Sequence, residues 1–522
     1  MADIVLINPK FEVSYWGMEY ALPYVGKRAN LPVAALPLLA ALTPGEHTIT
    51  LIDENVEPID FDRCARDDIV GLTGMSVQRF QMTEILTTLK ERGCFTVVGG
   101  PWVTVQDDYF GDLADVIFIG EAEETWPQFL ADWQAGRHAL RYEQAEKTDM
   151  TRVPVPRFDL LKMNRYAFGS LQFSRGCPFQ CEFCDIIVTF GRRPRLKTGA
   201  QVIAELEAIR RTGQRIVFIV DDNLIGNKKA IKAVLKDVIA WQQRNGYPLS
   251  FFTEASIDLA DDPELMAMMT EADFIAVFVG IESPDEESLR EAKKFQNVRG
   301  GGTLLEKVQR IQEAGMEVWS GMIIGFDSDD AGIFDRQVEF IQRARIPFAV
   351  VGLLHAIPKT PLYQRVLDEG RLDPADRPEF VTNIQPLKMG PEELRDGYLR
   401  VLTELSDPEN YFARTEALFL RPDFDIGCVK ALPVYWRRHQ LRYSLTQAEM
   451  ALAAIGLFLR LMSRIESTAL RREYRKRLWR FLKVHRRPGL TLFYMFHLVM
   501  HYHVHTMART MVNGEARLVN TF

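Results

Sequence analysis

Cysteine is scarce in this chain, with six residues in 522. So few cysteines cannot build the dense disulfide framework of a small secreted protein, and their scarcity favours a reducing compartment. Two other features are missing. The N-terminal run MADIVLINPKF lacks the basic region and apolar stretch of a secretory signal. No uncharged apolar run approaches the ~20 residues of a membrane-spanning helix. The sequence therefore predicts a cytoplasmic protein.

The remaining composition is that of an ordinary globular protein, 47% hydrophobic and 25% charged. A chain of 522 residues is too long for one core, so we expect about two to four domains. Charge is unevenly distributed. From residue 430 onward 17 Lys and Arg face 4 Asp and Glu, a net charge of +13, while the remainder carries −20. An acidic body with a basic tail predicts a local partner surface and argues against nucleic-acid binding.

Short apolar runs alternate with helical stretches in residues 1–140. Buried apolar runs of this kind predict a parallel, doubly wound sheet, which binds ligands at the carboxyl ends of its strands. The runs are residues 4–7, 48–52, 69–72, 96–99 and 116–119. Glycine at a strand end lets a flat ligand approach the backbone, although it also makes tight turns. The candidate cofactor-binding ends are Thr73, Gly74 and Met75; Gly99, Gly100 and Pro101; and Gly120 and Glu121.

A second alternating series follows residues 141–165, which lack periodicity and are predicted to be a linker. Between residues 166 and 390 the candidate strands are 171–176, 215–221, 248–255, 274–281, 317–325 and 348–355, with helices at 200–212, 229–245 and 302–314. Six βα units are too few for a closed eight-fold barrel. The pattern predicts a partial (β/α)6 TIM-type barrel, with functional residues at the carboxyl ends of its strands. Residues 391–522 are predicted to form a mostly helical, basic domain.

Three cysteines crowd into the run SRGCPFQCEFCD, directly after the first strand of that series: Cys177, Cys181 and Cys184. Thiolates select zinc or iron–sulfur clusters. Structural zinc usually takes four ligands as two separated pairs, and the chain has no second CxxC. A zinc site completed by His or Asp stays open as an alternative. The other cysteines are isolated, and the first two are expected to be small buried hydrophobes: Cys64, Cys94 and Cys428.

The CxxxCxxC spacing, with Phe183 before the last cysteine, resembles the signature of radical S-adenosylmethionine (SAM) enzymes. The resemblance implies that the three cysteines hold a 4Fe–4S cluster whose fourth iron binds SAM. It also implies SAM contacts at the following strand ends, although a carboxylate there is also a common helix cap. The implied contacts are Asp221, Asp222 and Asn223 after the second strand, Glu254 and Ser256 after the third, and Gly280 and Glu282 in VGIES.

A doubly wound domain before such a barrel resembles the cobalamin-dependent radical SAM methyltransferases, over residues 1 to about 390. The resemblance implies that an adenosyl radical takes hydrogen from an unactivated carbon, which then accepts a methyl group from methylcobalamin, at a cost of two SAM per turnover. The Asp-x-His-x-x-Gly pattern that ligates cobalt elsewhere is absent, since the domain has only His47 and His138. Bound cobalamin would therefore lack such a lower ligand. A domain that binds nothing is the alternative.

Four runs, GSLQFSRGCPFQCEFCD, GRRPRLKT, VDDNLIGNKK and NIQPLKM, most resemble the hopanoid C-2 methylases. The resemblance implies a polycyclic or lipid-like substrate and an electron donor such as flavodoxin or ferredoxin. Two alternatives stay open. One is a radical SAM and cobalamin enzyme that catalyses cyclisation or rearrangement without methyl transfer. The other is a non-enzymatic metal-binding module.

The basic tail contains an amphipathic helix at 471–487, with Trp479 and Phe481 among basic residues. Such a helix can lie on an anionic membrane, which predicts a peripheral contact at the inner face of the membrane. A solvated basic face packed on the acidic body is the alternative. The last helix carries a histidine group that is more typical of a buried polar stripe than of a metal site: His497, His501, His503 and His505.

Overall fold

The computed structural model describes residues 1–376, 381–421, 424–426 and 439–515, so Cys428 lies outside the described residues. The chain divides into two compact units. The first unit comprises Met1–Glu12, Arg28–Gly226 and Ile357–Arg365, and the second comprises Val13–Lys27, Asn227–Ala356 and Val366–Phe522. This division differs from the three predicted domains and their linker, because residues 166–226 group with the N-terminal sheet and residues 13–27 group with the later strands.

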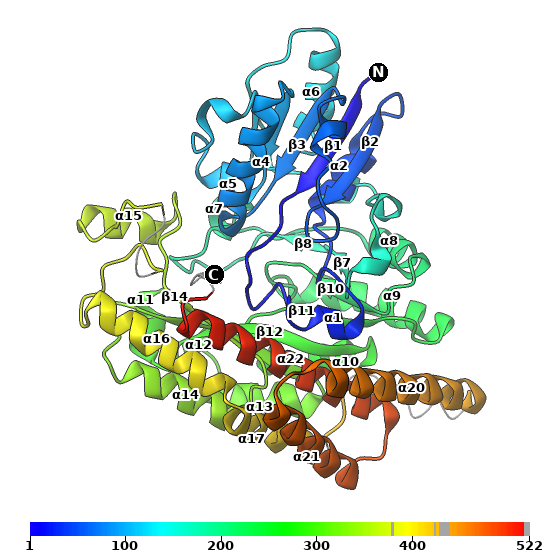
Figure 1. The fold of residues 1–522 in the computed structure, drawn as a ribbon, viewed down its shortest axis with the longest axis vertical. Helices are drawn as coiled ribbons and strands as arrows, with labels where there is room; N and C mark the ends of the chain where they lie inside the picture. Colours follow the sequence, from blue (N-terminus) through cyan, green and yellow to red (C-terminus); the bar gives the residue numbers. More distant parts are fainter. Residues whose placement is uncertain (377–380, 422–423, 427–438, 516–522) are drawn as a thin grey trace. The chain divides into compact units, whose positions relative to one another are not determined.

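The predicted doubly wound sheet is present in the first unit, as the blue strands of Figure 1 show. All five predicted strands form, each within one residue of the predicted bounds, and neighbouring strands are parallel. A sixth strand, β6, was not predicted. In spatial order the strands are β2 (Thr48–Asp53), β1 (Asp3–Asn8), β3 (Ile69–Thr73), β4 (Thr96–Gly99), β5 (Val116–Ile119) and β6 (Arg141–Glu143).

Helices cover both faces of this sheet because successive side chains of a strand point to opposite faces. Val5 and Ile7 of β1 pack with α4 and α5, whereas Ile4 and Leu6 pack with α2 and α6. The helices of the first unit are α2 (Ala35–Leu42), α3 (Phe61–Cys64), α4 (Arg79–Glu91), α5 (Pro101–Val105), α6 (Thr125–Gln134), α7 (Ile186–Thr189) and α8 (Gly199–Arg211).

Residues 141–165 are built into the first unit and do not form a free linker. Tyr142 of β6 packs into the sheet core. Met150 is fully buried, and its carbonyl accepts a 3.0 Å hydrogen bond from Gln201 Nε2 of α8. The segment was missed because β6 has three residues, too few to show the alternation that marks a strand.

The predicted strand at 171–176 is wrong in part, because it is divided in two. Its first part is β7 (Gly169–Leu171), which pairs in parallel with β10 (Ile216–Ile219). The second part, β8 (Ser174–Arg175), leaves β10 and forms an antiparallel pair with β9 (Arg195–Leu196). The chain therefore turns just before the cysteine run.

The second unit contains four parallel strands that match the predicted third to sixth strands of the series. Together with β7 and β10, they make six parallel strands in the second series. They are β11 (Ser250–Glu254), β12 (Phe274–Glu282), β13 (Glu317–Ile324) and β14 (Ala349–Leu353). The accompanying helices are α9 (Lys228–Asn245), α10 (Pro263–Glu271), α11 (Glu286–Glu291), α12 (Phe295–Val298), α13 (Leu304–Ala314) and α14 (Ile333–Arg343), followed by α15 (Pro361–Asp368) at the boundary between the units.

The C-terminal part of the second unit is helical, as predicted, and runs from yellow to red in Figure 1. The histidine group is hydrogen-bonded within the protein; His497, His501 and His503 are buried and His505 is half-buried. His497 forms hydrogen bonds with Tyr411 and Glu317. His501 Nδ1 forms a hydrogen bond with the Tyr474 hydroxyl, 2.6 Å away. The helices are α16 (Pro391–Ser406), α17 (Pro408–Phe419), α20 (Gln440–Arg464), α21 (Thr468–Val484) and α22 (Pro488–Val512).

The segment Val13–Lys27 leaves the end of β1 and packs within the second unit. Trp16 lies against Phe278 of β12, with ring centroids 4.9 Å apart. His503 of α22 accepts from the Tyr20 backbone at Nδ1 and donates from Nε2 to the Ser14 carbonyl, 2.9 Å away. These hydrogen bonds fix one neutral tautomer of His503, and burial lowers its pKa to about 4. The segment also carries α1 (Leu22–Val25).

Candidate active site

The cysteine run forms the loop between β8 and α7, in the first unit. Gly176 opens the loop with φ of 95°, and a Cβ there would lie 2.8 Å from the Gly191 carbonyl oxygen. Only glycine fits both the conformation and the space. Cys177 N donates back to the same Gly191 oxygen over 3.2 Å. The loop is thus a tight, backbone-held structure.

Two adjacent carboxylates after β10 hold the chain that leads into this loop. Asp221 accepts from Phe173 N at 2.7 Å and from Ser174 Oγ at 2.6 Å. Asp222 accepts from Gly176 N at 2.8 Å. These bonds fix the position of β8, whose own strand partner is β9. Burial raises the pKa of Asp221 to about 7 and that of Asp222 to about 6.

Asn223, the third residue of this group, contacts the cysteine loop directly. Its Nδ2 lies 3.9 Å from Cys177 Sγ and donates a hydrogen bond to that sulfur. Hydrogen bonds to ligating sulfurs are one means by which proteins set cluster potentials. Asp221, Asp222 and Asn223 therefore all act on the entry to the cysteine loop. Their predicted contacts with SAM stay a prediction.

The donor set fits an iron–sulfur cluster better than a single metal ion. Cys177, Cys181 and Cys184 are free thiols. Within residues 1–376, 381–421, 424–426 and 439–515, no three His, Cys, Asp or Glu side chains converge on one ion. A 4Fe–4S cluster does not need such convergence, because each cysteine binds a different iron. Burial, with the nearby Asp185 and the other thiols, raises the Cys184 pKa well above its usual value, and a bound metal centre would favour the thiolate.

The residues predicted to contact SAM from the second unit lie at the carboxyl ends of two adjacent parallel strands. Glu254 ends β11 and pairs in register with Phe278 of β12. Ser256, just beyond, donates to Asp258 over 2.5 Å. Gly280 and Glu282 lie near and at the end of β12.

The end of β12 is conformationally unusual. Glu282 has a positive φ of 65°, which is strained for a residue with a side chain. Its carboxylate forms a 2.6 Å ion pair with Lys294. A Cβ on Gly280 would lie 2.3 Å from the Glu282 carboxylate. Glycine at 280 therefore makes room for the Glu282–Lys294 pair.

At the edge of the first sheet that is predicted to bind a cofactor, the ends of β3 and β4 pack closely together. Gly100 has φ of 100°, and a Cβ there would lie 2.4 Å from Thr73 Oγ1. Gly74 has its own close neighbour, Met82 Sδ, at 2.5 Å from its ideal Cβ position. The ends of β3 and β4 therefore need glycine to pack against each other. Met75 is 52% exposed at this edge, which leaves an apolar side chain open to a ligand.

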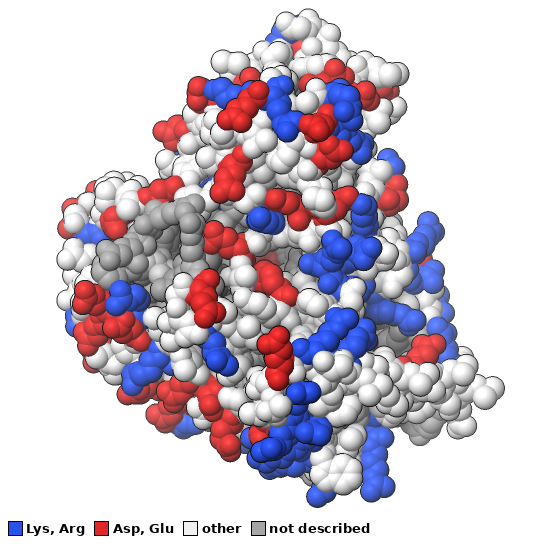
Figure 2. All heavy atoms as spheres, viewed as in Figure 1, with Lys and Arg blue, Asp and Glu red and all other residues white. Residues whose placement is uncertain are grey.

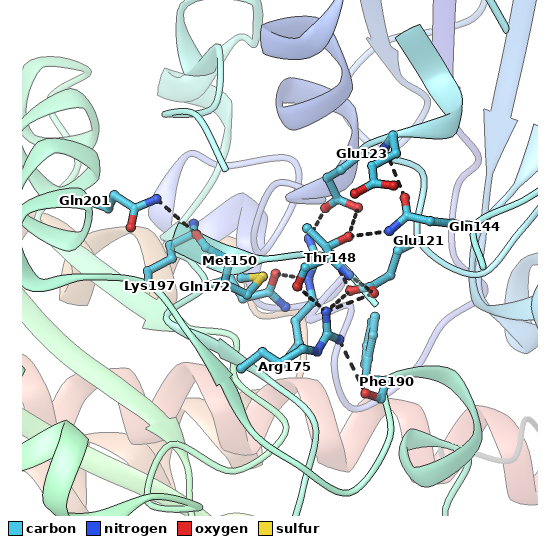
Figure 3. Close-up of polar contacts among 12 residues, drawn as sticks. Glu121, Glu123, Gln144, Thr148, Met150, Gln172, Arg175, Phe190, Lys197 and Gln201 are labelled. Atoms are coloured by element: carbon cyan, nitrogen blue, oxygen red, sulfur yellow. Dashed lines mark hydrogen bonds and ion pairs between the residues drawn. The ribbon is translucent and has the colours of Figure 1, made fainter. Parts of the chain in front are cut away.

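Glu121 does not face an open edge, because it is the centre of a buried ion-pair network (Figure 3). Arg175 Nη1 lies 2.8 Å from Glu121 and its Nη2 lies 2.6 Å from Glu123. Arg195 forms a second ion pair with Glu121 at 2.9 Å. Both carboxylates also accept from Thr148, one from its backbone and one from its hydroxyl. Glu121 therefore has a structural role in this network, and its predicted contact with a cofactor stays a prediction.

This network joins two distant parts of the first unit. Glu121 and Glu123 follow β5 of the sheet, whereas Arg175 lies two residues before Cys177. Burial would raise the pKa of Glu123, but the Arg175 guanidinium outweighs burial and lowers it. Sequence reasoning missed Arg175 and Arg195, because their partners lie 54 and 74 residues away. The only local signal was a basic residue placed directly before the cysteine run.

Comparison with known proteins decides the family. A model described as the radical SAM superfamily matches residues 171–334, and a domain of unknown function matches residues 360–517. An uncharacterized methyltransferase of Synechocystis sp. is 42% identical over 80% of this chain and 78% of its own length. The hopanoid C-2 methylase of Rhodopseudomonas palustris is 36% identical over 71% of each chain. The chain belongs to the radical SAM methyltransferases.

Solved structures show that this radical SAM methyltransferase shares its fold with a cobalamin-dependent radical SAM enzyme and with another radical SAM methyltransferase. The cobalamin-dependent radical SAM enzyme OxsB aligns with 99% of this chain and 80% of its own, with a TM-score of 0.59 and 15% identity. The methyltransferase TsrM from Kitasatospora setae aligns with 71% of this chain and 76% of its own, with a TM-score of 0.58 and 17% identity. The predicted fold class and the radical SAM family are confirmed. Of the predicted cofactors, a 4Fe–4S cluster and SAM are those of the radical SAM family, and cobalamin is the cofactor named for OxsB.

Proposed function

We propose that this radical SAM methyltransferase methylates an unactivated carbon of a polycyclic, lipid-like substrate. The observation that carries the proposal is its 36% identity to a hopanoid C-2 methylase over 71% of both chains. Substrate choice does not follow from fold alone, so the substrate class is where the proposal is most open to refutation.

In this proposal Cys177, Cys181 and Cys184 hold the cluster. When bound, the cluster and SAM supply radical chemistry and cobalamin supplies the methyl group. The chain itself orients and shields these groups. Asp221 and Asp222 fix the backbone that enters the loop, and Asn223 donates to Cys177 Sγ.

We also propose which residues contact SAM and which contact cobalamin. We assign SAM recognition to Phe183 and to the strand ends of the second unit: Glu254, Ser256, Gly280 and Glu282. We assign cobalamin to the edge of the first sheet: Thr73, Gly74, Met75, Gly99, Gly100, Pro101, Gly120 and Glu121. The exposed Met75 of that edge supports this second assignment.

The deciding experiment compares lipids from a host that expresses the chain with lipids from the same host expressing Cys177→Ala. We expect a polycyclic lipid that gains one methylene in the first host only. Feeding methionine with a labelled methyl group should place the label in that product. If purified enzyme forms 5′-deoxyadenosine but no labelled product from any polycyclic lipid, the cyclisation or rearrangement alternative replaces this proposal. A colourless protein that binds zinc and never cleaves SAM would favour the non-enzymatic alternative.

The reaction consumes electrons, and we propose flavodoxin or ferredoxin as the donor. A cytoplasmic location fits this choice and fits the free cysteines. A lipid-like substrate also requires access to a membrane. We therefore propose a peripheral membrane contact through the basic C-terminal helices, and the surface of these helices supports it.

A further inference from the structure

Helix α20 exposes an apolar stripe to solvent, whereas an ordinary surface helix turns its apolar face towards the core. Five large aliphatic side chains recur at intervals of three, four or seven residues along one face. They are between 57% and 84% exposed: Leu441, Leu445, Leu452, Ile455 and Leu459. Figure 2 shows the region of α20 as a mainly white projection of the second unit. A contiguous exposed apolar surface of this kind marks an interaction site.

The opposite face of α20 is held by the protein. Ala454, Leu457 and Leu461 are buried, and α20 packs along α22 and against α1. The helix is long and apolar enough to cross a membrane, although only 17% of its apolar window is buried inside the protein. A spanning orientation would break the packing with α22. A helix with one apolar face and one anchored face lies flat in a membrane interface.

Basic residues stand at both ends of the stripe. Arg442 donates to the Asn245 carbonyl at one end, and Arg464 donates to the Pro23 carbonyl at the other. Carbonyl oxygens carry no formal charge, so these hydrogen bonds do not neutralise either guanidinium group. The following helix α21 adds further basic residues, including Arg472 and Arg475, and Figure 2 shows blue atoms gathered over it.

We propose that the α20 stripe inserts into the surface of an anionic bilayer, with the helix parallel to the membrane. The inference rests on the membrane contact proposed above and names the element that makes it. Apolar insertion supplies most of the binding, and the flanking arginines select anionic headgroups. A second copy of the chain is the competing occupant, but paired copies would bring these basic helix ends together at a cost.

The test is flotation of the reconstituted full-length enzyme with phosphatidylcholine vesicles, with and without phosphatidylglycerol. Wild-type protein should float with the phosphatidylglycerol vesicles. The double variant Leu452→Glu/Ile455→Glu should partition at least about tenfold less, because two charges then face the acyl region. Leu140→Glu is the matched control, since Leu140 is 74% exposed in the first unit, and it should float like wild type.

Two outcomes would overturn the proposal. One is a double variant that floats like wild type. The other is wild-type protein that ignores both vesicles but forms a dimer that the double variant abolishes, which would assign the stripe to a second copy. SAM cleavage measured without vesicles separates this result from the proposed reaction. The double variant should cleave SAM like wild type, so loss of flotation alone leaves the methylation proposal intact.

Discussion

Asp221 is a carboxyl group almost completely removed from water, with 1% of its surface exposed. Its carboxylate accepts hydrogen bonds from Phe173 N and Ser174 Oγ, yet burial still raises its pKa to about 7. A folded pKa above the unfolded one means that the folded state binds the proton more tightly. The stabilisation from this group is therefore complete below about pH 4 and is lost as pH rises towards 7.

Asp221→Asn should remove this pH dependence, because asparagine resembles the protonated carboxyl group and can still accept from Phe173 N. The thermal midpoint of wild type, relative to that of the variant, should fall as pH rises from about 5 to about 8. The exposed Asp108→Asn provides the control and should show no such trend. A constant difference between wild type and Asp221→Asn across that range would contradict the raised pKa.

Asn223 touches a cysteine through its side-chain amide. Replacing it with leucine removes a donor to Cys177 Sγ at similar volume. A lost hydrogen bond leaves more negative charge on the sulfur, so the cluster should become harder to reduce and its potential more negative. A redox titration followed by electron paramagnetic resonance measures this shift. Asn245→Leu, at the end of α9, is the matched control, and equal potentials in all three proteins would refute the role of Asn223.

Among the elements, β8 is only two residues long and leads directly into the cysteine loop, so its position depends on side-chain contacts as well as on strand pairing. Its Arg175 pairs with Glu121 and Glu123, which follow β5. All three side chains are at most 9% exposed. Removing one partner from a buried pair leaves an uncompensated charge, at a cost of about 3–5 kcal/mol. The network thus connects the sheet to the cysteine loop by buried ion pairs.

Arg175→Met should destabilise the region more than the double change Arg175→Met/Glu123→Leu, which removes both charges. Hydrogen–deuterium exchange at residues 171–178 and 120–124 should report faster opening in the single variant and partial recovery in the double variant. Under turnover, the single variant should release more 5′-deoxyadenosine per methylated product. An additive effect of the two changes would show that Arg175 and Glu123 do not act as a pair.

At the scale of the whole molecule, each unit borrows a segment from the other side of the chain. Residues 13–27 belong to the second unit and residues 357–365 to the first. A single cut therefore cannot release either unit intact. We expect a chain truncated after Gly226 to be degraded by dilute protease under conditions that leave the full chain intact. A soluble, protease-resistant fragment of residues 1–226 would contradict this.

Much of the fold could be predicted from the sequence because the strands of both sheets are continuous apolar runs. The cluster-binding loop could also be predicted, since three thiols within eight residues are typical of a metal centre. The division of strand 171–176 could not be predicted, because its second half pairs with β9 and is held by Asp221 and Asp222, which all lie later in the chain. The role of Glu121 was hidden in the same way.

The apolar stripe of α20 illustrates a different gap. Its run of aliphatic residues was visible, but a helix that is apolar on several sides does not reveal which side faces solvent. That depends on where α22 packs, which only the tertiary structure fixes. The histidine group of α22 was predicted better, because buried histidines usually find partners within the protein.

The segment Ile357–Arg365 has a consequence for the synthesis of this protein. Once residue 184 has been translated, the first unit still lacks one of its parts until residue 365 follows, about 9–36 s later at about 5–20 residues per second. During that interval the cysteine loop and the sheet edge are already made but cannot yet be enclosed. The nascent chain therefore passes through a long period in which its thiols are open to oxidation and to the wrong metal. A host that produces the active enzyme should need anaerobic or chaperone-assisted conditions during translation, and not only during assembly of its cofactors.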